Sequence, residues 1–434
     1  LRRWLDACKS LIALAALCAA IDQGEPGMTA NDRHAKQRHS IFHAAEGLWE
    51  RHDWIHNAIV QGTVVFVLAI GVRLALHDYQ TSEHVTRDGC EYLNLAKSLY
   101  AENSYNAPGY GLPFLARPTA PSLDLLRPPL YPILVSGAYS IFGVTHFAAQ
   151  FVCIVSGALV VVVLYSLVYT LTQDRGTSFL ASCFVAIQPE CVLGSIRPLT
   201  EQPFTLFVLA SLLALVRPPR TINTIVGAVC LGLAFLTRYQ AVVFVPVAIV
   251  YFFYRCNLRS ALTSSMLFVT AFLIVLAPWM WRNYSITGNP IYGDHIHIGA
   301  IYCLSENDVE ARRMVLTPDT ERLTVGQVWK RYPLKKLRHV VQNFRTMVLD
   351  APLHIGHPFL FAFALIGAIV SFRRSAEMKF ITLCVAACWV FFAATYFKSR
   401  FLQPIIPIYL AWSAMGGVWL AKKVDVGETA PRIL

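Results

Sequence analysis

The chain has 434 residues, of which 56% are hydrophobic and 15% charged, and its mean hydropathy is +0.49. Soluble domains carry about 25% charged residues, so this composition excludes an ordinary soluble enzyme. It predicts an all-α polytopic membrane protein, because helices satisfy their own backbone polar groups within lipid. The net charge of +11 is explained by basic residues that gather in cytoplasmic loops, beside anionic lipid head groups. No nucleic-acid partner is therefore expected.

Residues 1–57 precede the first long apolar run, and we expect them to be a cytoplasmic segment. Residues 1–27 carry basic residues followed by a short apolar run, as in a weak signal peptide, but that run is too short to cross a bilayer. An upstream extension of the reading frame before Met28 is one explanation for them. No inference is based on residues 1–27.

Ten apolar runs follow, so we predict about ten transmembrane helices, with nine or eleven as the alternatives. They form an N-terminal membrane region over residues 58–281 and C-terminal helices over residues 358–421, with a cytoplasmic tail over residues 422–434. The runs begin near Ala58, Ala148, Thr177, Pro203, Thr221, Ala241, Ala261, Pro358, Phe380 and Leu402.

One apolar segment, residues 128–143, is short and begins with two prolines, so we expect an interfacial or half-inserted helix there. If it does not span, all the short basic loops fall on the side of the N-terminal segment, as the positive-inside rule requires. Residues 77–147 and 282–357 are then large extracytoplasmic loops. The short basic loops are 173–175, 217–220, 255–259 and 373–379.

Two carboxylates, Asp88 and Glu91, open the first of these large loops in the stretch RDGCEYLNLAKSLY. Tyr92, Leu95 and Leu99 recur there at helical spacing, which predicts an amphipathic helix. In one interpretation Asp88 caps this helix and Glu91 completes a pattern like a capping box. In the other, Asp88 is a general base that takes a proton from a hydroxyl at the membrane surface. The spacing alone favours neither interpretation.

Arginines recur at the predicted outer ends of the spans. Taken alone, each arginine is explained as a residue at a helix end whose long side chain reaches the lipid head groups. Together they place several planar donor groups, which suit phosphate oxygens, on the face that carries Asp88. Glu201 lies among them, either as a partner of Arg197 or as part of a site. The arginines are Arg127, Arg197, Arg238, Arg282 and Arg400.

Histidines in the stretches GDHIHIGA and LHIGH could supply ligands to a divalent metal ion. Such histidine pairs are frequent by chance, and no further ligand lies nearby in the sequence. We therefore expect no cofactor, with a divalent metal as the alternative. The sequence also has no phosphate-binding loop and no nucleophile elbow, so a soluble nucleotide donor is not predicted.

Several short motifs follow one another along the chain. They are Asp88 with Tyr92 and an LAxxL helix, the RPPLYP turn at 127–132, LTE at 199–201, GLAFLTR at 232–238, APWMWRN at 277–283 and RFLQPIIP at 400–407. In this order they resemble motifs of bacterial membrane glycosyltransferases of the GT-C type, in the branch of protein O-mannosyltransferases and of the enzyme that adds aminoarabinose to lipid A. The resemblance covers roughly residues 58–420. One departure is Gly89, because many relatives carry two adjacent acids at this point.

The resemblance implies the GT-C fold and a transferase whose donor is a sugar on a polyprenyl phosphate. The acceptor would be a hydroxyl of a lipid, glycan or protein on the outer face of a bacterial cytoplasmic membrane. Asp88 would be the general base of an inverting reaction, with Glu91 as a second catalytic residue. Glu201 would bind the donor, either by orienting its sugar or as a further carboxylate. The expected phosphate-binding residues are Arg127, Arg238, Arg282 and Arg400.

Two other classes of protein remain as alternatives. A transporter would carry internal repeats and charges near the middle of the membrane, whereas the charges here gather at the ends of the spans. A polymerase or ligase of lipid-linked glycans would use the same lipid phosphate but move a whole chain.

Overall fold

The computed structural model divides into two compact units, Leu1–Gln61 and Gly62–Leu434. Most of the first unit, including the predicted cytoplasmic segment 1–57, lies outside the residues that the structure describes. The described residues are 58–80, 85–107, 122–293, 295–305, 310–311, 314, 321, 323–354 and 358–429.

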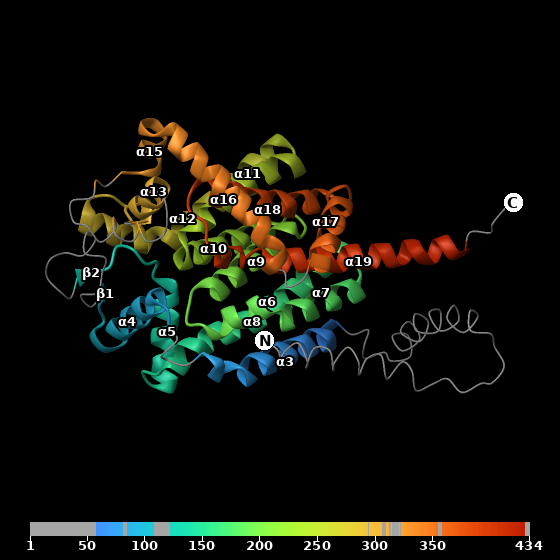
Figure 1. The fold of residues 1–434 in the computed structure, drawn as a ribbon, viewed down its shortest axis with the longest axis horizontal. Coiled ribbons are helices and arrows are strands. Elements are labelled where there is room, and N and C mark those ends of the chain that lie inside the picture. Colours follow the sequence, from blue (N-terminus) through green and yellow to red (C-terminus); the bar gives the residue numbers. More distant parts are fainter. Residues whose placement is uncertain are drawn as a thin grey trace. The chain divides into compact units, whose positions relative to one another are not determined.

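A helix lies at or within a few residues of every predicted start of a span (Figure 1). The all-α membrane fold predicted from the composition is therefore confirmed. The helices are α3 (Ala58–Ala75), α6 (His146–Thr172), α7 (Arg175–Ile187), α9 (Glu201–Val216), α10 (Thr221–Thr237), α11 (Phe244–Arg255), α12 (Leu258–Thr287), α17 (Pro358–Phe372), α18 (Ala376–Ala394) and α19 (Ile406–Thr429).

Among the described residues, four helices are long and apolar enough to cross a membrane: α3 with η1 (His77–Tyr79), α6, α12 and α18. A fifth span is possible if α7 and α8 (Pro189–Ile196) are one broken helix, bent by 54°. The break lies at Gln188, whose backbone is extended because a residue before proline avoids the helical conformation. The other apolar helices have 10–17 residues, so length and composition do not decide the predicted number of ten.

Polar side chains fix where several of these helices begin. Thr145 accepts a hydrogen bond from the Ala148 amide at the start of α6, and Asn257 accepts one from Ser260 at the start of α12. Asp174 does the same for α7. Each cap satisfies an amide that the first turn of a helix leaves without a partner.

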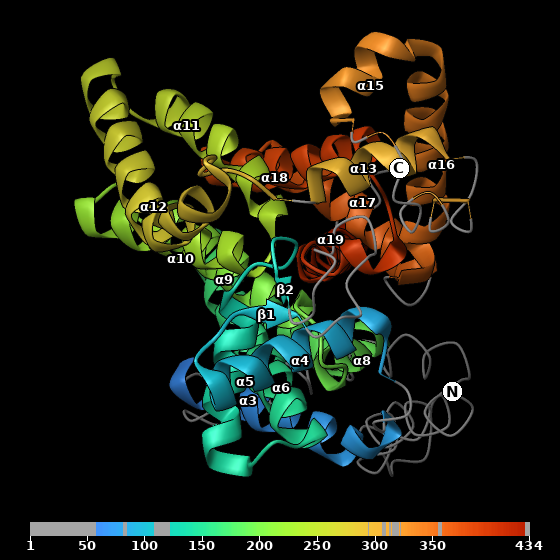
Figure 2. The same ribbon diagram turned by 90° about the vertical axis from the view of Figure 1, so that its left-hand side faces the viewer.

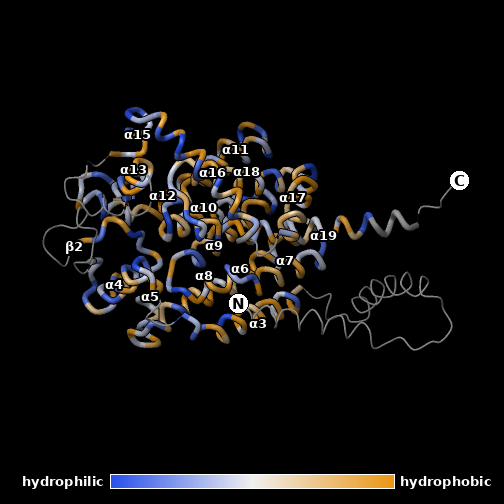
Figure 3. Tube along the Cα trace, viewed as in Figure 1, coloured by the Kyte–Doolittle hydropathy of each residue, from blue (hydrophilic) through white to orange (hydrophobic). Residues whose placement is uncertain are grey.

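The main hydrophobic core lies between α6, α9, α10, α12, α18 and α19. Leu164, Leu209, Leu231, Phe268 and Leu410 are fully buried within it. Figure 3 shows hydrophobic positions along these helices and more hydrophilic ones on α15. Such helices are apolar on most sides because they face either lipid or each other.

Two glycines allow α17 and α19 to touch backbone to backbone. A methyl group at Gly367 would overlap the carbonyl oxygen of Trp412, and one at Gly416 would overlap that of Phe363. Small residues at such crossings let membrane helices approach closely. The C-terminal helix that follows Arg400 is therefore fixed firmly against its neighbour.

The short basic loops are joined to one another by polar contacts. Arg255 donates to the carbonyl oxygen of Arg217 at 2.9 Å and forms an ion pair with Glu377 at 3.2 Å. Lys422 lies 4.0 Å from Asp174. The loops that the charge pattern assigns to one side of the membrane therefore lie beside each other in two groups.

The first large loop contains α4 (Arg87–Glu102), the two-residue strands β1 (Asn106–Ala107) and β2 (Ser122–Leu123), and α5 (Leu130–Phe142). The strands pair antiparallel. Tyr92 on α4 meets Tyr131 on α5 edge to face, with ring centres 5.4 Å apart. With 13 residues, α5 is about 20 Å long, shorter than the roughly 30 Å hydrocarbon layer, as expected for an interfacial or half-inserted helix.

The second large loop contains α13 (His295–Leu304), α15 (Val325–Arg331) and α16 (Pro333–His354), which lie together in Figure 2. The amide group of Asn343 on α16 donates to the carbonyl oxygens of Phe392 and Ala393 at the end of α18. Cys303 on α13 bonds the carbonyl oxygen of Thr395. The loop is therefore attached to the end of α18 that leads to Arg400.

Candidate active site

The α4 helix that carries Asp88 is capped by a different residue. Thr86 has an extended backbone, and its hydroxyl accepts a hydrogen bond from the Gly89 amide at 3.2 Å. The interpretation of Asp88 and Glu91 as a capping box is therefore wrong. Because Thr86 supplies the cap, the carboxylate of Asp88 in the first turn is free to point away from the helix.

Gly89 explains how α4 reaches its neighbour. A side chain at this position would meet Val85 at 2.8 Å and the carbonyl oxygen of Pro198 at 3.3 Å. The absence of a side chain lets the start of α4 lie against the segment that leads into Glu201. The departure from two adjacent acids thus brings Asp88 close to the first residue of α9.

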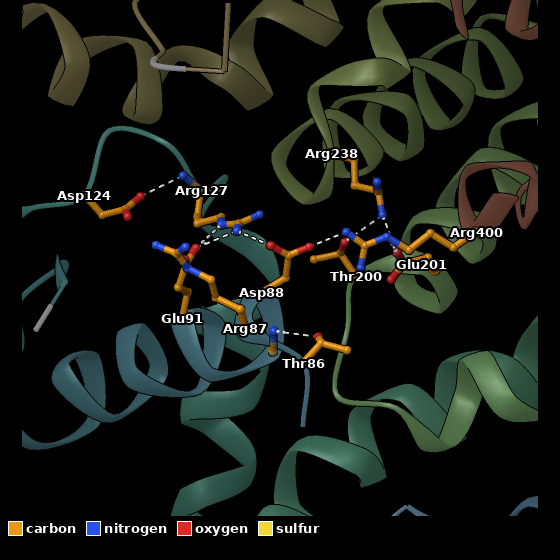
Figure 4. A network of polar contacts seen from close by, with 11 residues as sticks. Thr86, Arg87, Asp88, Glu91, Asp124, Arg127, Thr200, Glu201, Arg238 and Arg400 are labelled. Carbon is orange, nitrogen blue, oxygen red and sulfur yellow. Dashed lines mark hydrogen bonds and ion pairs between the residues drawn. The ribbon is translucent and has the colours of Figure 1, made fainter. Parts of the chain in front are cut away.

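Arg127 lies between the two carboxylates of α4 (Figure 4). Its Nη2 atom donates to Asp88 Oδ1 at 2.7 Å, and its Nε atom donates to Glu91 Oε2 at 2.9 Å. Its guanidinium also lies over the ring of Tyr92, 4.9 Å from the ring centre. Asp88 and Glu91 are three residues apart, so one arginine can bond both from the same side of the helix.

Asp124 shapes the turn that presents Arg127. Its Oδ1 atom accepts hydrogen bonds from the backbone amides of Arg127 at 2.6 Å and Leu126 at 3.0 Å. Burial raises the pKa of Asp124 to about 6, although these hydrogen bonds and the charge of Arg127 oppose the shift. The sequence analysis missed this residue; its position three residues before Arg127 in a turn was the available signal.

Glu201 forms the other end of the site. Its Oε1 atom lies 2.8 Å from Arg238 Nη1 and 3.7 Å from Arg400 Nε, and its side chain is only 4% exposed. Arg238 also donates to the hydroxyl of Thr200 at 3.2 Å. The partners of Glu201 are therefore Arg238 and Arg400 rather than Arg197, because residues 197–200 turn away before α9 begins.

Arg400 connects the two ends. Its Nη2 atom bonds Asp88 Oδ2, while its Nε atom faces Glu201. It lies in η4 (Ser399–Leu402), the short helix between α18 and α19. Residues from α4, the RPPLYP turn, α9, the end of α10 and η4 thus meet in one network (Figure 4).

Arg282 is the predicted site residue that lies outside this network. Its Nη2 atom donates to the carbonyl oxygen of Asp124 at 2.9 Å, and its guanidinium lies over the rings of Trp279 and Tyr105 at 4.6 and 5.1 Å. It does not contribute to the lining of the cavity described below. From α12, Arg282 instead holds the turn that presents Arg127.

Asp88, Glu91 and three arginines of the network line a cavity of about 690 Å³. Aromatic side chains from outside α4 also line it, so the cavity offers both charged groups and apolar surface. This combination suits a ligand with an anionic group and an apolar part. The aromatic residues are Tyr239, Tyr302, Phe391, Phe392, Tyr396 and Phe401.

The charges of the site keep Asp88 ionised. Burial alone would raise the pKa of Asp88, but the charges of Arg127 and Arg400 outweigh it and hold the pKa well below the ordinary value. A carboxylate held in this way is always available as an acceptor of a proton but is a weak base until one of its partners leaves.

The predicted histidine ligands do not form a metal site among the described residues, where no group of three or more His, Cys, Asp or Glu side chains comes together. His295 stacks on Tyr239 with ring centres 4.2 Å apart, and burial together with the charge of His297 lowers the pKa of His295 to about 4. The side chain of His354 and the whole of His357 lie outside the described residues.

Comparison with known proteins supports the expected fold. Residues 126–281 match the model of a family described as dolichyl-phosphate-mannose-protein mannosyltransferase. The match covers less than half of the chain; it includes Arg127, Glu201 and Arg238 but neither Asp88 nor Arg400. No curated protein matches the chain by sequence.

Two solved structures share the fold over most of the chain. One is ArnT from Cupriavidus metallidurans bound to undecaprenyl phosphate, with a TM-score of 0.57 and 15% identity over 85% of this chain. The other is the oligosaccharyltransferase AglB from Archaeoglobus fulgidus with an inhibitory peptide and a dolichol-phosphate, with a TM-score of 0.56 and 13% identity over 86% of this chain. The chain spans 60% and 52% of the lengths of these two proteins.

The predicted fold, that of GT-C type membrane glycosyltransferases, is therefore confirmed.

Proposed function

Because the chain has the fold of GT-C type membrane glycosyltransferases, we propose that it transfers a sugar from a polyprenyl-phosphate donor to a hydroxyl group. The acceptor is a lipid, a glycan or a protein, and the reaction takes place on the extracytoplasmic face of a bacterial cytoplasmic membrane. The observation that carries the proposal is Asp88 bonded between Arg127 and Arg400 in a cavity that aromatic side chains also line.

The cavity suits a lipid-linked phosphate for two reasons. Arginine forks bind phosphate oxygens through two parallel hydrogen bonds, and three arginines of the network line the cavity. Phe391 and Phe392, which also line it, offer apolar surface to the first isoprene units. No nucleotide is needed, since the sugar arrives already activated by its link to the phosphate.

The reaction proposed is a single displacement with inversion. The acceptor oxygen attacks the anomeric carbon, and its proton passes to a carboxylate oxygen of Asp88. The bond between that carbon and the phosphate oxygen breaks, and its electron pair stays on the phosphate. Arg238 and Arg400 stabilise the charge that develops on the leaving phosphate.

Glu201 has a different role in this scheme. It is almost fully buried and forms ion pairs with both Arg238 and Arg400. We assign it the orientation of these two arginines toward the phosphate. Glu91 instead holds Arg127 in place beside Asp88, through two hydrogen bonds.

The proposal is tested by native mass spectrometry of the detergent-purified wild type, Asp88→Asn and Arg197→Gln, incubated with lipid extracted from the host. Arg197 is an arginine near the predicted surface that does not line the cavity, so its variant is the matched control. We expect a polyprenyl-phosphate sugar on all three proteins, and its accumulation on Asp88→Asn, which binds the donor but cannot accept the proton. If no folded protein retained such a lipid, a carrier function would be favoured instead.

A further inference from the structure

Arg400 is held less firmly than the other two arginines of the network. Arg127 bonds Asp88 and Glu91, lies over Tyr92 and is 16% exposed. Arg238 is 12% exposed and is held by Glu201, by the hydroxyl of Thr200 and by the side chain of Gln240. The side chain of Arg400, in contrast, is 30% exposed. All three arginines line the cavity.

The hydrogen-bonding capacity of Arg400 is also incompletely used. Its Nε atom is buried but makes no hydrogen bond, and the carboxylate of Glu201 faces it only at ion-pair distance, 3.7 Å. A buried donor without a hydrogen bond costs free energy, so an anion that accepted from it would gain from the contact. The fork of Arg400 therefore has a donor without a hydrogen bond, and the same side chain lines the cavity in which we place the donor phosphate.

The carboxylate of Asp88, in contrast to Arg400, has both of its oxygens occupied. Its Oδ1 atom accepts from Arg127 and its Oδ2 atom accepts from Arg400, so both oxygens face a positive charge. A carboxylate bonded on both oxygens is a poor acceptor for another proton. The base needs Oδ2 to become free, and only Arg400 has to move for that to happen.

We propose that Arg400 is shared between Asp88 and the donor phosphate: without donor it covers Asp88 Oδ2, and when donor binds it turns to the phosphate and frees that oxygen for the acceptor proton. This inference rests on the proposed function, since it requires a phosphate in the cavity. Arg127 stays on Oδ1 and keeps the carboxylate in place. Donor binding thus switches on the base before an acceptor is used.

The same exchange resets the site. After transfer, Asp88 carries the acceptor proton, and Arg400 and Arg238 hold the polyprenyl phosphate that has lost its sugar. When this product leaves, Arg400 returns to Asp88 Oδ2, and its charge expels the proton to solvent. The cycle therefore needs no other base.

The test is a double-mutant cycle on the binding of undecaprenyl phosphate by the full-length protein in detergent, read as a dissociation constant from native mass spectrometry titrations. The four proteins are the wild type, Asp88→Asn, Arg400→Gln and the double variant. Removing the carboxylate releases Arg400 to the phosphate, so we expect Asp88→Asn to bind about tenfold more tightly than wild type. In the Arg400→Gln background the same substitution should change binding by less than about twofold.

Glu91→Gln is the matched control, because it removes one negative charge from the same network without touching Arg400. It should tighten binding by less than about twofold, which separates release of Arg400 from a general loss of repulsion. If Arg400→Gln elutes as an aggregate, Arg400→Met, which keeps the apolar stem, takes its place in the cycle.

Two results would overturn the sharing of Arg400 while leaving the donor assignment intact. In one, Asp88→Asn tightens the binding of undecaprenyl phosphate equally with and without Arg400. In the other, Glu91→Gln tightens it as much as Asp88→Asn does. Absence of binding to the folded wild type would overturn both.

Discussion

Two arginines bond the same carboxylate, and they come from very different places in the chain. Arg127 lies 39 residues after Asp88, in the same large loop, and is anchored by Glu91 and by the ring of Tyr92. Arg400 lies 312 residues after Asp88, in a short helix between two spans, with more exposure and a donor that makes no hydrogen bond. In the proposed mechanism the local partner stays on Asp88, and the distant partner moves to the phosphate.

This difference gives the two ends of the site different tasks. In the proposed mechanism, the end formed by α4 and the RPPLYP turn holds the base, and its geometry depends on one loop. The end formed by Glu201, Arg238 and Arg400 depends on how α9, α10 and η4 pack. A ligand that enters the cavity can thus change one bond of Asp88 and leave the other in place.

The largest effect is expected at the base itself. Asp88→Asn should lower the rate of sugar transfer by about 10³–10⁴-fold, because an amide cannot accept the proton. Donor binding should survive, as Asn keeps the shape of the side chain. Single-turnover transfer from a radiolabelled polyprenyl-phosphate sugar measures this, and a loss of less than about tenfold would assign the base to another residue.

Substitutions of Arg127 and Arg400 should differ in their effect on the stability of the protein. Arg127→Gln leaves Asp88 and Glu91 as neighbouring charges, so it should lower the free energy of unfolding by up to about 3 kcal/mol, near the low end for a broken buried pair. Arg400→Gln should change stability by less than about 1 kcal/mol but lower transfer about 100-fold. Thermal unfolding in detergent, measured beside the transfer rate, distinguishes them; equal destabilisation would contradict the assigned roles.

Arg282 offers a test of a supporting role. Because it holds the turn at Asp124 through a backbone carbonyl rather than lining the cavity, Arg282→Lys should lower transfer by only about threefold to tenfold. The affinity for undecaprenyl phosphate should be unchanged. A loss of affinity as large as that of Arg238→Gln would place Arg282 at the phosphate after all.

The two aspartates of the first loop should respond to pH with opposite signs. The pKa of Asp124 is raised from 3.8 to about 6, so between pH 4 and 6 the folded state binds a proton that the unfolded state has lost. The contribution of Asp124 to stability should therefore fall as pH rises through this window and level off above it, while His295, whose pKa is lowered to about 4, contributes the opposite slope. Asp124→Asn should lack only the contribution of Asp124, so the stability difference between wild type and Asp124→Asn isolates it. Asp88, with its pKa lowered, contributes stability that is lost only as the pH falls below its ordinary value.

Melting temperatures of the wild type and Asp124→Asn between pH 4 and 7 measure this slope. A wild-type stability that rose with pH in this window, with no difference from Asp124→Asn, would contradict the raised pKa.

The smallest effect is expected from chelation. Asp88, Glu91 and Glu201 are already paired with arginines, so the proposed reaction uses no metal ion. Treatment with EDTA should change the transfer rate by less than about twofold. A larger loss that zinc or magnesium restored would show that a metal takes part.

Local features of the site could be predicted from the sequence. The helix that carries Asp88, the short helix at 128–143 and the arginines near the ends of spans all follow from periodicity, proline and charge, which act over a few residues. The cap was mistaken, because Thr86 and Asp88 are both good capping residues and only the backbone decides between them.

The ion-pair partner of each charged side chain could not be predicted from such local patterns. Glu201 has Arg197 one turn away in the sequence, yet it pairs with Arg238 and Arg400 because the chain turns at Pro198 before α9 begins. Arg282 shares the sequence signature of the other arginines, but packing against Trp279 and Tyr105 directs it to a backbone carbonyl instead.

The sequence by itself therefore predicted a helical membrane protein with the GT-C fold and with acids and arginines near the ends of its spans, since hydropathy and short motifs are local properties. Only the tertiary structure decided that Arg400 reaches Asp88 across 312 residues, because an ion pair between distant segments depends on how helices pack.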